Sequence, residues 1–218
     1  MIRHIIFDMD GVLLDSEPVY RERIKRFMCM KGFTDIPEEL YDRTCGANSV
    51  DTYRMFREKV KGFAMDYDTY MAERKAFNGA RLLDPKEMVD QEIYPLFKYL
   101  KEEGFRIALA SSSFKETIER NLKLLEIADV FDVVVSGMDF EHSKPDPEIY
   151  FYTMRQLQAV PENCLVVEDS GYGIAAAKAA GAIVIAKRDE RFGYDQSQAD
   201  YTVERLLQIV DIIKADFS

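Results

Sequence analysis

The chain has 218 residues, which fits one domain, or one domain that carries a smaller insertion. Hydrophobic residues make up 47% and charged residues 31% of the sequence, so the composition is that of a folded globular protein and excludes a disordered chain. The formal net charge of −10 argues against nucleic acid or an anionic membrane as a partner, because binding either one needs a basic face.

The first predicted element is a strand over residues 5–7, which stops at the loop signature Asp8-Met9-Asp10-Gly11. Residues 16–85 follow without a clear strand, and their apolar side chains recur at helical spacing. Continuous apolar runs, separated by segments with helical period, then predict strands over residues 107–110, 133–135, 165–167 and 183–186. Continuous runs are typical of parallel strands that helices cover on both faces. The predicted fold is therefore α/β: a doubly wound, mainly parallel, Rossmann-like sheet over residues 1–15 and 86–218, with an inserted all-helical cap domain over residues 16–85.

The three cysteines include no C-x-x-C pair, which predicts reduced thiols in a cytoplasmic protein. The apolar amino terminus reaches Asp8 within a few residues, which is too soon for a signal peptide or a membrane span. We therefore expect a cytoplasmic protein without a membrane partner. Its oligomeric state stays open between a monomer and a weak homo-oligomer.

Acidic and hydroxyl side chains follow the predicted strands, at the edge where ligands bind in doubly wound sheets. In chain order these residues are Asp8 and Asp10, then Ser111, Ser112 and Ser113, then Lys144, and finally Glu168 and Asp169. Four carboxylates within reach of one another repel unless a cation joins them, and an oxygen-rich cluster suits Mg²⁺. One of the two acids after the first strand can act as a nucleophile, forming an aspartyl-phosphate, and the other as a general acid and base. Gly11 permits a sharp turn there, and Lys144 would offset the charge of a phosphate.

These segments resemble the four motifs of the haloacid dehalogenase superfamily. Residues 8–17 are similar to the first motif, 108–113 to the second, 143–147 to the third, and 167–170 with Gly173 to the fourth. The motifs occur in the family's order, and the insert lies where the family's helical C1 cap lies. The nearest branch contains β-phosphoglucomutase-like proteins and sugar-phosphate phosphatases.

The resemblance implies a role for each motif residue. Asp8 would attack phosphorus and bind Mg²⁺, and Asp10 would shuttle the proton and bind the metal through its backbone carbonyl. Ser111 and Lys144 would hold the phosphoryl group. Asp169 would bind Mg²⁺, with Glu168 as a further ligand or a near neighbour.

The choice between hydrolysis and a mutase reaction depends on residues of the cap. Mutases of this branch carry a histidine where this chain has Tyr20, and an arginine where it has Ser49, three residues after Gly46. We therefore predict a phosphatase that acts on a small phosphorylated metabolite, with the β-phosphoglucomutase reaction as the alternative. The cap would close over the site, exclude water and select the substrate. The predicted substrate-binding residues are Gly11, Tyr20, Gly46, Ser49, Lys75, Ser112 and Ser113.

Two remote alternatives stay open. Residues 171–176 match the G-x-G-x-x-A fingerprint of an NAD-binding oxidoreductase. Against this interpretation, Glu168 and Asp169 would repel a pyrophosphate, and only one clear strand is predicted to follow them. The other alternative is a non-catalytic, phosphate-binding protein with the same fold, but every catalytic position of the motifs is filled.

Overall fold

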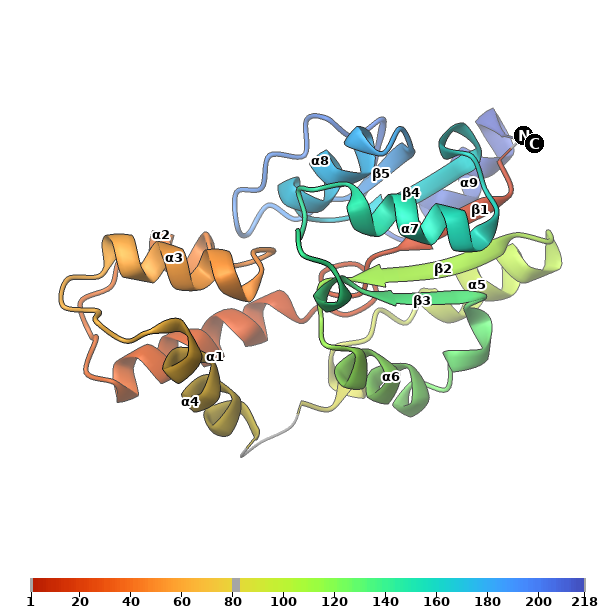
Figure 1. Ribbon diagram of the computed structural model, residues 1–218. Coiled ribbons are helices and arrows are strands. Elements are labelled where there is room, and N and C mark those ends of the chain that lie inside the picture. The colour runs from red at the N-terminus through yellow and green to blue at the C-terminus, as the bar shows by residue number, and fades with distance from the viewer. Residues whose placement is uncertain (1, 80–82, 218) are drawn as a thin grey trace. The chain divides into compact units, whose positions relative to one another are not determined.

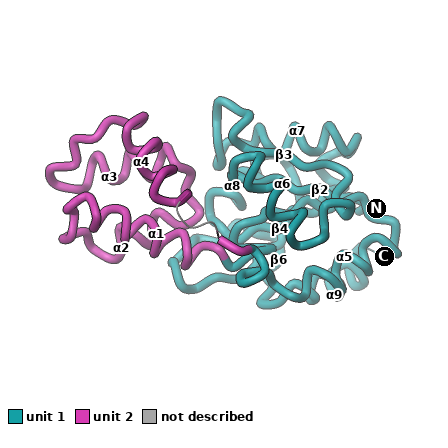
Figure 2. The backbone as a smooth tube through the Cα atoms, turned by 90° about the horizontal axis from the view of Figure 1, so that it is seen from below, with its two compact units in different colours: residues 1–15, 85–218 teal, residues 16–84 magenta. Residues whose placement is uncertain are grey.

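The structure is a computed structural model that describes residues 2–79 and 83–217, so residues 80–82 of the predicted cap lie outside the described part. The chain divides into two compact units, which Figure 2 shows in different colours. Unit 1 comprises residues 1–15 and 85–218, and unit 2 comprises residues 16–84.

Unit 1 is built on a parallel sheet (Figure 1). Within the described residues the sheet has six strands: β1 (His4–Phe7), β2 (Arg106–Ser111), β3 (Val133–Ser136), β4 (Cys164–Glu168), β5 (Ile183–Lys187) and β6 (Tyr201–Val203). Their order across the sheet is β3-β2-β1-β4-β5-β6, and all neighbours run parallel. This arrangement confirms the predicted α/β class.

Helices cover both faces of the sheet. The helices of this unit are α5 (Ile93–Glu102), α6 (Lys115–Leu124), α7 (Glu148–Leu157), α8 (Gly171–Ala179) and α9 (Gln208–Asp216), with short 3₁₀ turns η1 (Pro85–Glu87), η2 (Ala128–Val130), η3 (Gly137–Asp139) and η4 (Pro161–Asn163). Ile5 and Phe7 of β1 pack with α5, α6 and α9, whereas Ile6 packs with α7 and α8. Successive strand residues thus enter separate cores, which is why the strands have continuous apolar sequences.

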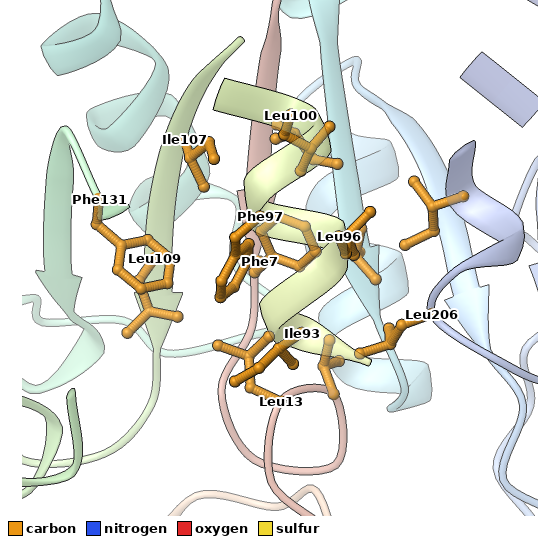
Figure 3. Packing of buried hydrophobic residues seen from close by; sticks show 14 of the residues in the cluster. Phe7, Leu13, Ile93, Leu96, Phe97, Leu100, Ile107, Leu109, Phe131 and Leu206 are labelled. Atoms are coloured by element: carbon orange, nitrogen blue, oxygen red, sulfur yellow. The ribbon is translucent and has the colours of Figure 1, made fainter. Parts of the chain in front are cut away.

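Aromatic side chains hold α5 against the sheet (Figure 3). The ring of Phe97 meets Phe7 of β1 edge to face at a centroid distance of 5.3 Å, and it meets Phe131 at 5.4 Å. Both distances lie in the range preferred by edge-to-face pairs. This packing fixes the end of β1, directly before Asp8.

The described part of unit 2 is helical, with α1 (Glu17–Met30), α2 (Glu38–Asp42), α3 (Ser49–Lys59) and α4 (Tyr67–Gly79). Its core consists largely of aromatic side chains, among them Phe27, Phe56, Phe63 and Tyr70. The apolar residues at helical spacing in this region are therefore core residues. None of the described helices of either unit is long and apolar enough to cross a membrane.

One strand of the sheet, β6, is not predicted from the sequence. We predicted a single clear strand after Glu168, but both β5 and β6 follow it. β6 has three residues, pairs with β5 alone and exposes Thr202, so it lacks the apolar run that identifies the buried strands. The number of strands is therefore no argument against a dinucleotide-binding fold. The geometry of the site has to distinguish the NAD-binding alternative from a phosphatase.

Candidate active site

Asp8 lies at the centre of the carboxyl edge of the sheet. Phe7 is level with Leu109 of β2 on one side and with Val167 of β4 on the other. The strand order reverses between β1 and β4, because the chain continues from β1 to β2 and β3 before it returns to β4. Such a switch point leaves a crevice beyond the strand ends, where ligands bind in doubly wound sheets.

A tight turn follows Asp8. Gly11 adopts a φ of +82°, which favours glycine, and its N–H donates to the carbonyl oxygen of Leu14 at 2.7 Å. A Cβ at residue 11 would collide with the carboxylate of Asp169. The glycine therefore lets the loop after β1 approach the acid that follows β4.

Lys144 joins two acids from different strands. Its ammonium group lies 2.6 Å from Oδ1 of Asp8 and 2.6 Å from Oε1 of Glu168, and it also donates to the carbonyl oxygen of Ala110 at 3.1 Å. Asp8 and Lys144 are each 7% exposed, and Glu168 is 1% exposed. The three side chains thus form one buried group of charges.

A single ammonium is too little to neutralise two buried carboxylates. Burial raises the pKa of Asp8 to about 8, against the lowering effect of Lys144 and with a contribution from the negative charges of Glu168 and Asp10. Burial alone would lower the pKa of Lys144, but Asp8 and Glu168 outweigh it and hold that pKa well above its usual value. Lys144 therefore stays charged, and the cluster has room for one more positive charge.

The acids of this edge form a buried cluster that suits a divalent cation. Asp8, Glu168 and Asp169 each offer a ligand atom, and these atoms lie within 4.8 Å of one another. The donors are all carboxylate oxygens, which Mg²⁺ prefers, and the absence of a side chain at Gly11 lets the Asp169 carboxylate lie against the loop after β1. The residues therefore fit Mg²⁺.

Hydroxyl groups lie beside Asp10. Ser113 donates from Oγ to Oδ2 of Asp10 at 2.8 Å, and its backbone N–H donates to Oγ of Ser111 at 3.1 Å. Ser111 is buried at the end of β2, and Ser112 is half-buried in the same loop. The structure thus brings together the residues predicted from unit 1, while their individual roles stay predictions.

Two residues around the cluster were missed by the sequence analysis. Tyr150 is fully buried and donates from its hydroxyl to Oε1 of Glu168 at 2.5 Å. Gln196 donates to the backbone carbonyls of Asp169 and Lys187 at 2.5 Å and 2.8 Å. A buried tyrosine needs a partner for its hydroxyl, but its sequence position does not identify that partner.

Gly173 lies directly beside the acid cluster, and its position argues against the NAD-binding alternative. A Cβ at residue 173 would collide with the carboxylate of Glu168, so the glycine makes room for this buried acid. In a dinucleotide-binding turn the glycines instead make room for a pyrophosphate, whose negative charge Glu168 would repel. The geometry therefore disfavours the oxidoreductase.

We expect Gly173→Ala to lower both stability and activity. The added methyl group has to displace Glu168, and overpacking of this kind costs about 1–3 kcal/mol of unfolding free energy. Any phosphatase activity should fall by about tenfold to a hundredfold, because the shifted Glu168 moves Lys144.

Thermal melts and initial rates would measure both effects. The matched control is Gly79→Ala in α4, where an added Cβ meets no atom within 4 Å. This control should keep the wild-type activity and melt at or slightly above the wild-type temperature. Wild-type behaviour of Gly173→Ala would contradict the account.

The remaining predicted residues lie in unit 2. Tyr20 is on α1, Gly46 follows α2, Ser49 begins α3, and Lys75 is exposed on α4. The N–H of Gly46 donates to the buried Glu17 at 3.1 Å, and Arg74 donates to the hydroxyl of Tyr70 at 3.3 Å. These contacts stabilise unit 2, and the assignment of Tyr20, Gly46, Ser49 and Lys75 to substrate binding stays a prediction.

Comparison with known proteins supports the predicted resemblance. The family described as haloacid dehalogenase-like hydrolase matches residues 5–187. The phosphorylated carbohydrates phosphatase of Thermotoga maritima is 34% identical over 180 residues, which cover 81% of each chain. Fructose-1-phosphate phosphatase YqaB of Escherichia coli is 30% identical over 182 residues, which cover 81% of this chain and 92% of that protein.

A solved structure extends the comparison to the fold. β-Phosphoglucomutase from Clostridium difficile superposes with a TM-score of 0.82 at 22% identity, over 98% of this chain and 96% of that one. At this identity the likeness establishes the shared fold.

Proposed function

Because this chain belongs to the haloacid dehalogenase-like hydrolase family, we propose that it is a Mg²⁺-dependent phosphatase of a sugar phosphate. The observation that carries the proposal is the buried group of Asp8, Lys144, Glu168 and Asp169 at the switch point of the sheet. The names of the relatives from Thermotoga maritima and Escherichia coli support a phosphorylated carbohydrate as the substrate.

In the proposed mechanism Asp8 is the nucleophile. A carboxylate oxygen of Asp8 forms a bond to phosphorus as the bond to the sugar oxygen breaks, and Asp10 gives its proton to that oxygen. Asp10 then takes a proton from a water molecule that attacks the phosphorus of the aspartyl-phosphate. Inorganic phosphate leaves, and Asp8 is restored with Asp10 again protonated.

The other residues of the cluster supply charge and orientation. Lys144 places a fixed positive charge 2.6 Å from Asp8, where the phosphoryl group would develop negative charge. Asp8, Asp169, Glu168 and the backbone carbonyl of Asp10 would hold Mg²⁺, which when bound supplies the further positive charge that phosphoryl transfer needs. Ser111 would donate a hydrogen bond to the phosphoryl oxygens.

The test is phosphate release from a panel of sugar phosphates, with MgCl₂ and again with EDTA. The panel includes β-glucose 1-phosphate, for which conversion to glucose 6-phosphate is measured as well. We expect phosphate release that EDTA abolishes and added Mg²⁺ restores. Faster formation of glucose 6-phosphate than of phosphate would instead establish the mutase alternative, and no reaction with any substrate would contradict the proposal.

We expect the affinity for Mg²⁺ to rise with pH. An ordinary aspartic acid loses its proton near about pH 4. Without a cation, the raised pKa of Asp8 keeps this side chain protonated up to about pH 8. Mg²⁺ binds the deprotonated carboxylate and has to release this proton, so the apparent affinity should increase by up to about tenfold per pH unit and level off above about pH 8. Titration of the melting temperature with MgCl₂ at several pH values would measure this dependence. The same affinity at about pH 6 and about pH 8 would contradict the assigned protonation of Asp8.

A further inference from the structure

Tyr150 is a buried residue of α7 that reaches the acid cluster from the side of the sheet covered by α7 and α8. The side chain has no exposed surface, and its hydroxyl lies 2.5 Å from Oε1 of Glu168. The ammonium of Lys144 lies 5.1 Å from the centre of its ring. Tyr150 therefore contacts two members of the cluster, although it is neither an acid nor a base in the proposed reaction.

The hydrogen bonds of Glu168 differ between its two oxygens. Oε1 accepts two short bonds, from Tyr150 at 2.5 Å and from Lys144 at 2.6 Å. Oε2 accepts long ones, from the N–H of Asp169 at 3.2 Å and from Oγ of Ser170 at 3.4 Å. An ionised carboxylate oxygen has about two acceptor sites. Short bonds occupy those of Oε1, whereas the two bonds of Oε2 are long, so Oε2 is the oxygen that a cation can reach more easily.

The carboxylate of Glu168 has little freedom to turn. Gly173 packs against it so closely that a Cβ there would collide with it. Lys144 also holds it, but the same ammonium divides its hydrogen bonds between Glu168, Asp8 and the carbonyl oxygen of Ala110. The hydroxyl of Tyr150 donates its short hydrogen bond to Glu168.

We propose that Tyr150 is a positioning residue of the cation site: its hydroxyl occupies Oε1 of Glu168 and thereby keeps Oε2 available to a divalent cation held with Asp8 and Asp169. The inference rests on the proposed function only in that the acid cluster is taken as the Mg²⁺ site. Groups that orient metal ligands in this way typically change metal affinity or activity by about tenfold to a hundredfold when they are removed.

The experiment measures binding of Mg²⁺ alone by titration calorimetry to the wild-type protein, Tyr150→Phe and Tyr152→Phe. Phenylalanine keeps the ring and removes only the hydroxyl. Tyr152→Phe is the matched control on the same helix, because Tyr152 is 37% exposed and its ring packs against Phe140. We expect Tyr150→Phe to bind Mg²⁺ about tenfold more weakly than the wild type and Tyr152→Phe to bind within about twofold of it.

A second readout separates positioning from a general structural role. In Tyr150→Phe, half-maximal phosphate release should need about tenfold more Mg²⁺, while KM for the sugar phosphate at saturating Mg²⁺ stays unchanged. In a Glu168→Gln background the same substitution should have little further effect on Mg²⁺ binding, because Tyr150 acts through Glu168. Independent, multiplying effects of the two substitutions would overturn the inference, even if Tyr150→Phe also lowers the melting temperature.

The outcomes distinguish this inference from the proposed function. Wild-type Mg²⁺ affinity of a folded Tyr150→Phe would overturn the inference and leave the phosphatase intact. A wild-type protein that binds Mg²⁺ but releases no phosphate from any substrate would contradict the proposed function, and the effect of Tyr150 on binding would still stand.

Discussion

Replacing Asp8 with asparagine is expected to lower phosphate release by at least about ten-thousandfold, because the amide is not a nucleophile and no aspartyl-phosphate can form. This factor corresponds to about 5 kcal/mol of lost transition-state stabilisation. Asparagine has nearly the same shape and still accepts a hydrogen bond from Lys144, which lies 2.6 Å from the carboxylate oxygen in the wild type. The loss should therefore come from the chemistry and not from unfolding.

The stability of Asp8→Asn provides the check. The raised pKa of Asp8 means that the folded protein holds a proton that the unfolded chain releases, so this residue costs stability as the pH rises from about 4 to about 8. Without a cation, Asp8→Asn should thus be at least as stable as the wild type at about pH 8. The matched control is Asp139→Asn, which removes a carboxylate at an exposed position of η3 and should keep full activity. Wild-type turnover of Asp8→Asn would refute the covalent mechanism.

Replacing Lys144 with methionine should affect stability most. The substitution leaves the buried acids Asp8 and Glu168 without their shared ammonium, and removing one partner of a buried ion pair typically costs about 3–5 kcal/mol. Phosphate release should fall by about a hundredfold to a thousandfold, because the fixed positive charge beside the reacting group is lost.

The pH dependence of the stability lost in Lys144→Met distinguishes an electrostatic cause from a packing cause. Lys144 itself stays protonated well beyond neutral pH, so its own titration adds nothing between about pH 5 and about pH 8. Its removal takes away the group that lowers the pKa of Asp8, so that pKa rises further and the variant keeps the proton of Asp8 at a pH where the wild type releases it. Chemical denaturation should show a similar loss at about pH 5 and about pH 7, where both folded proteins hold this proton, and a larger loss at about pH 9. A loss independent of pH would point to packing instead. Lys98→Met, at a side chain that is 76% exposed, should leave stability and activity unchanged.

The fold could be predicted wherever burial leaves a mark on the sequence. The strands beside β1 lie between two layers of helices, and their continuous apolar runs identify them. β6 at the edge has three residues and one exposed position, so its sequence lacks the apolar run by which the other strands are predicted. The helical character of residues 16–79 also follows from spacing, because the aromatic side chains that recur there form the core of unit 2.

The site was predictable in its charged residues and not in its hydrogen bonds. The strand ends predict that Asp8, Ser111 and Glu168 share one edge of the sheet, because parallel strands end together. Tyr150 and Gln196 lie in a helix and a loop whose sequences identify no partner, and their contacts depend on how those elements dock onto the sheet. The role of Gly173 could not be predicted from the sequence either, because its sequence pattern also fits a dinucleotide-binding turn. Only the structure shows that this glycine makes room for the carboxylate of Glu168.

The most direct test of the central claim is a phosphorus NMR spectrum of the wild-type protein with Mg²⁺ and a mixture of sugar phosphates that includes β-glucose 1-phosphate. Inorganic phosphate and each phosphomonoester give separate signals, so one spectrum distinguishes hydrolysis from isomerisation. The account predicts growth of the inorganic phosphate signal, which stops on addition of EDTA and is absent with Asp8→Asn. An unchanged spectrum, or the same growth with Asp8→Asn, would contradict it.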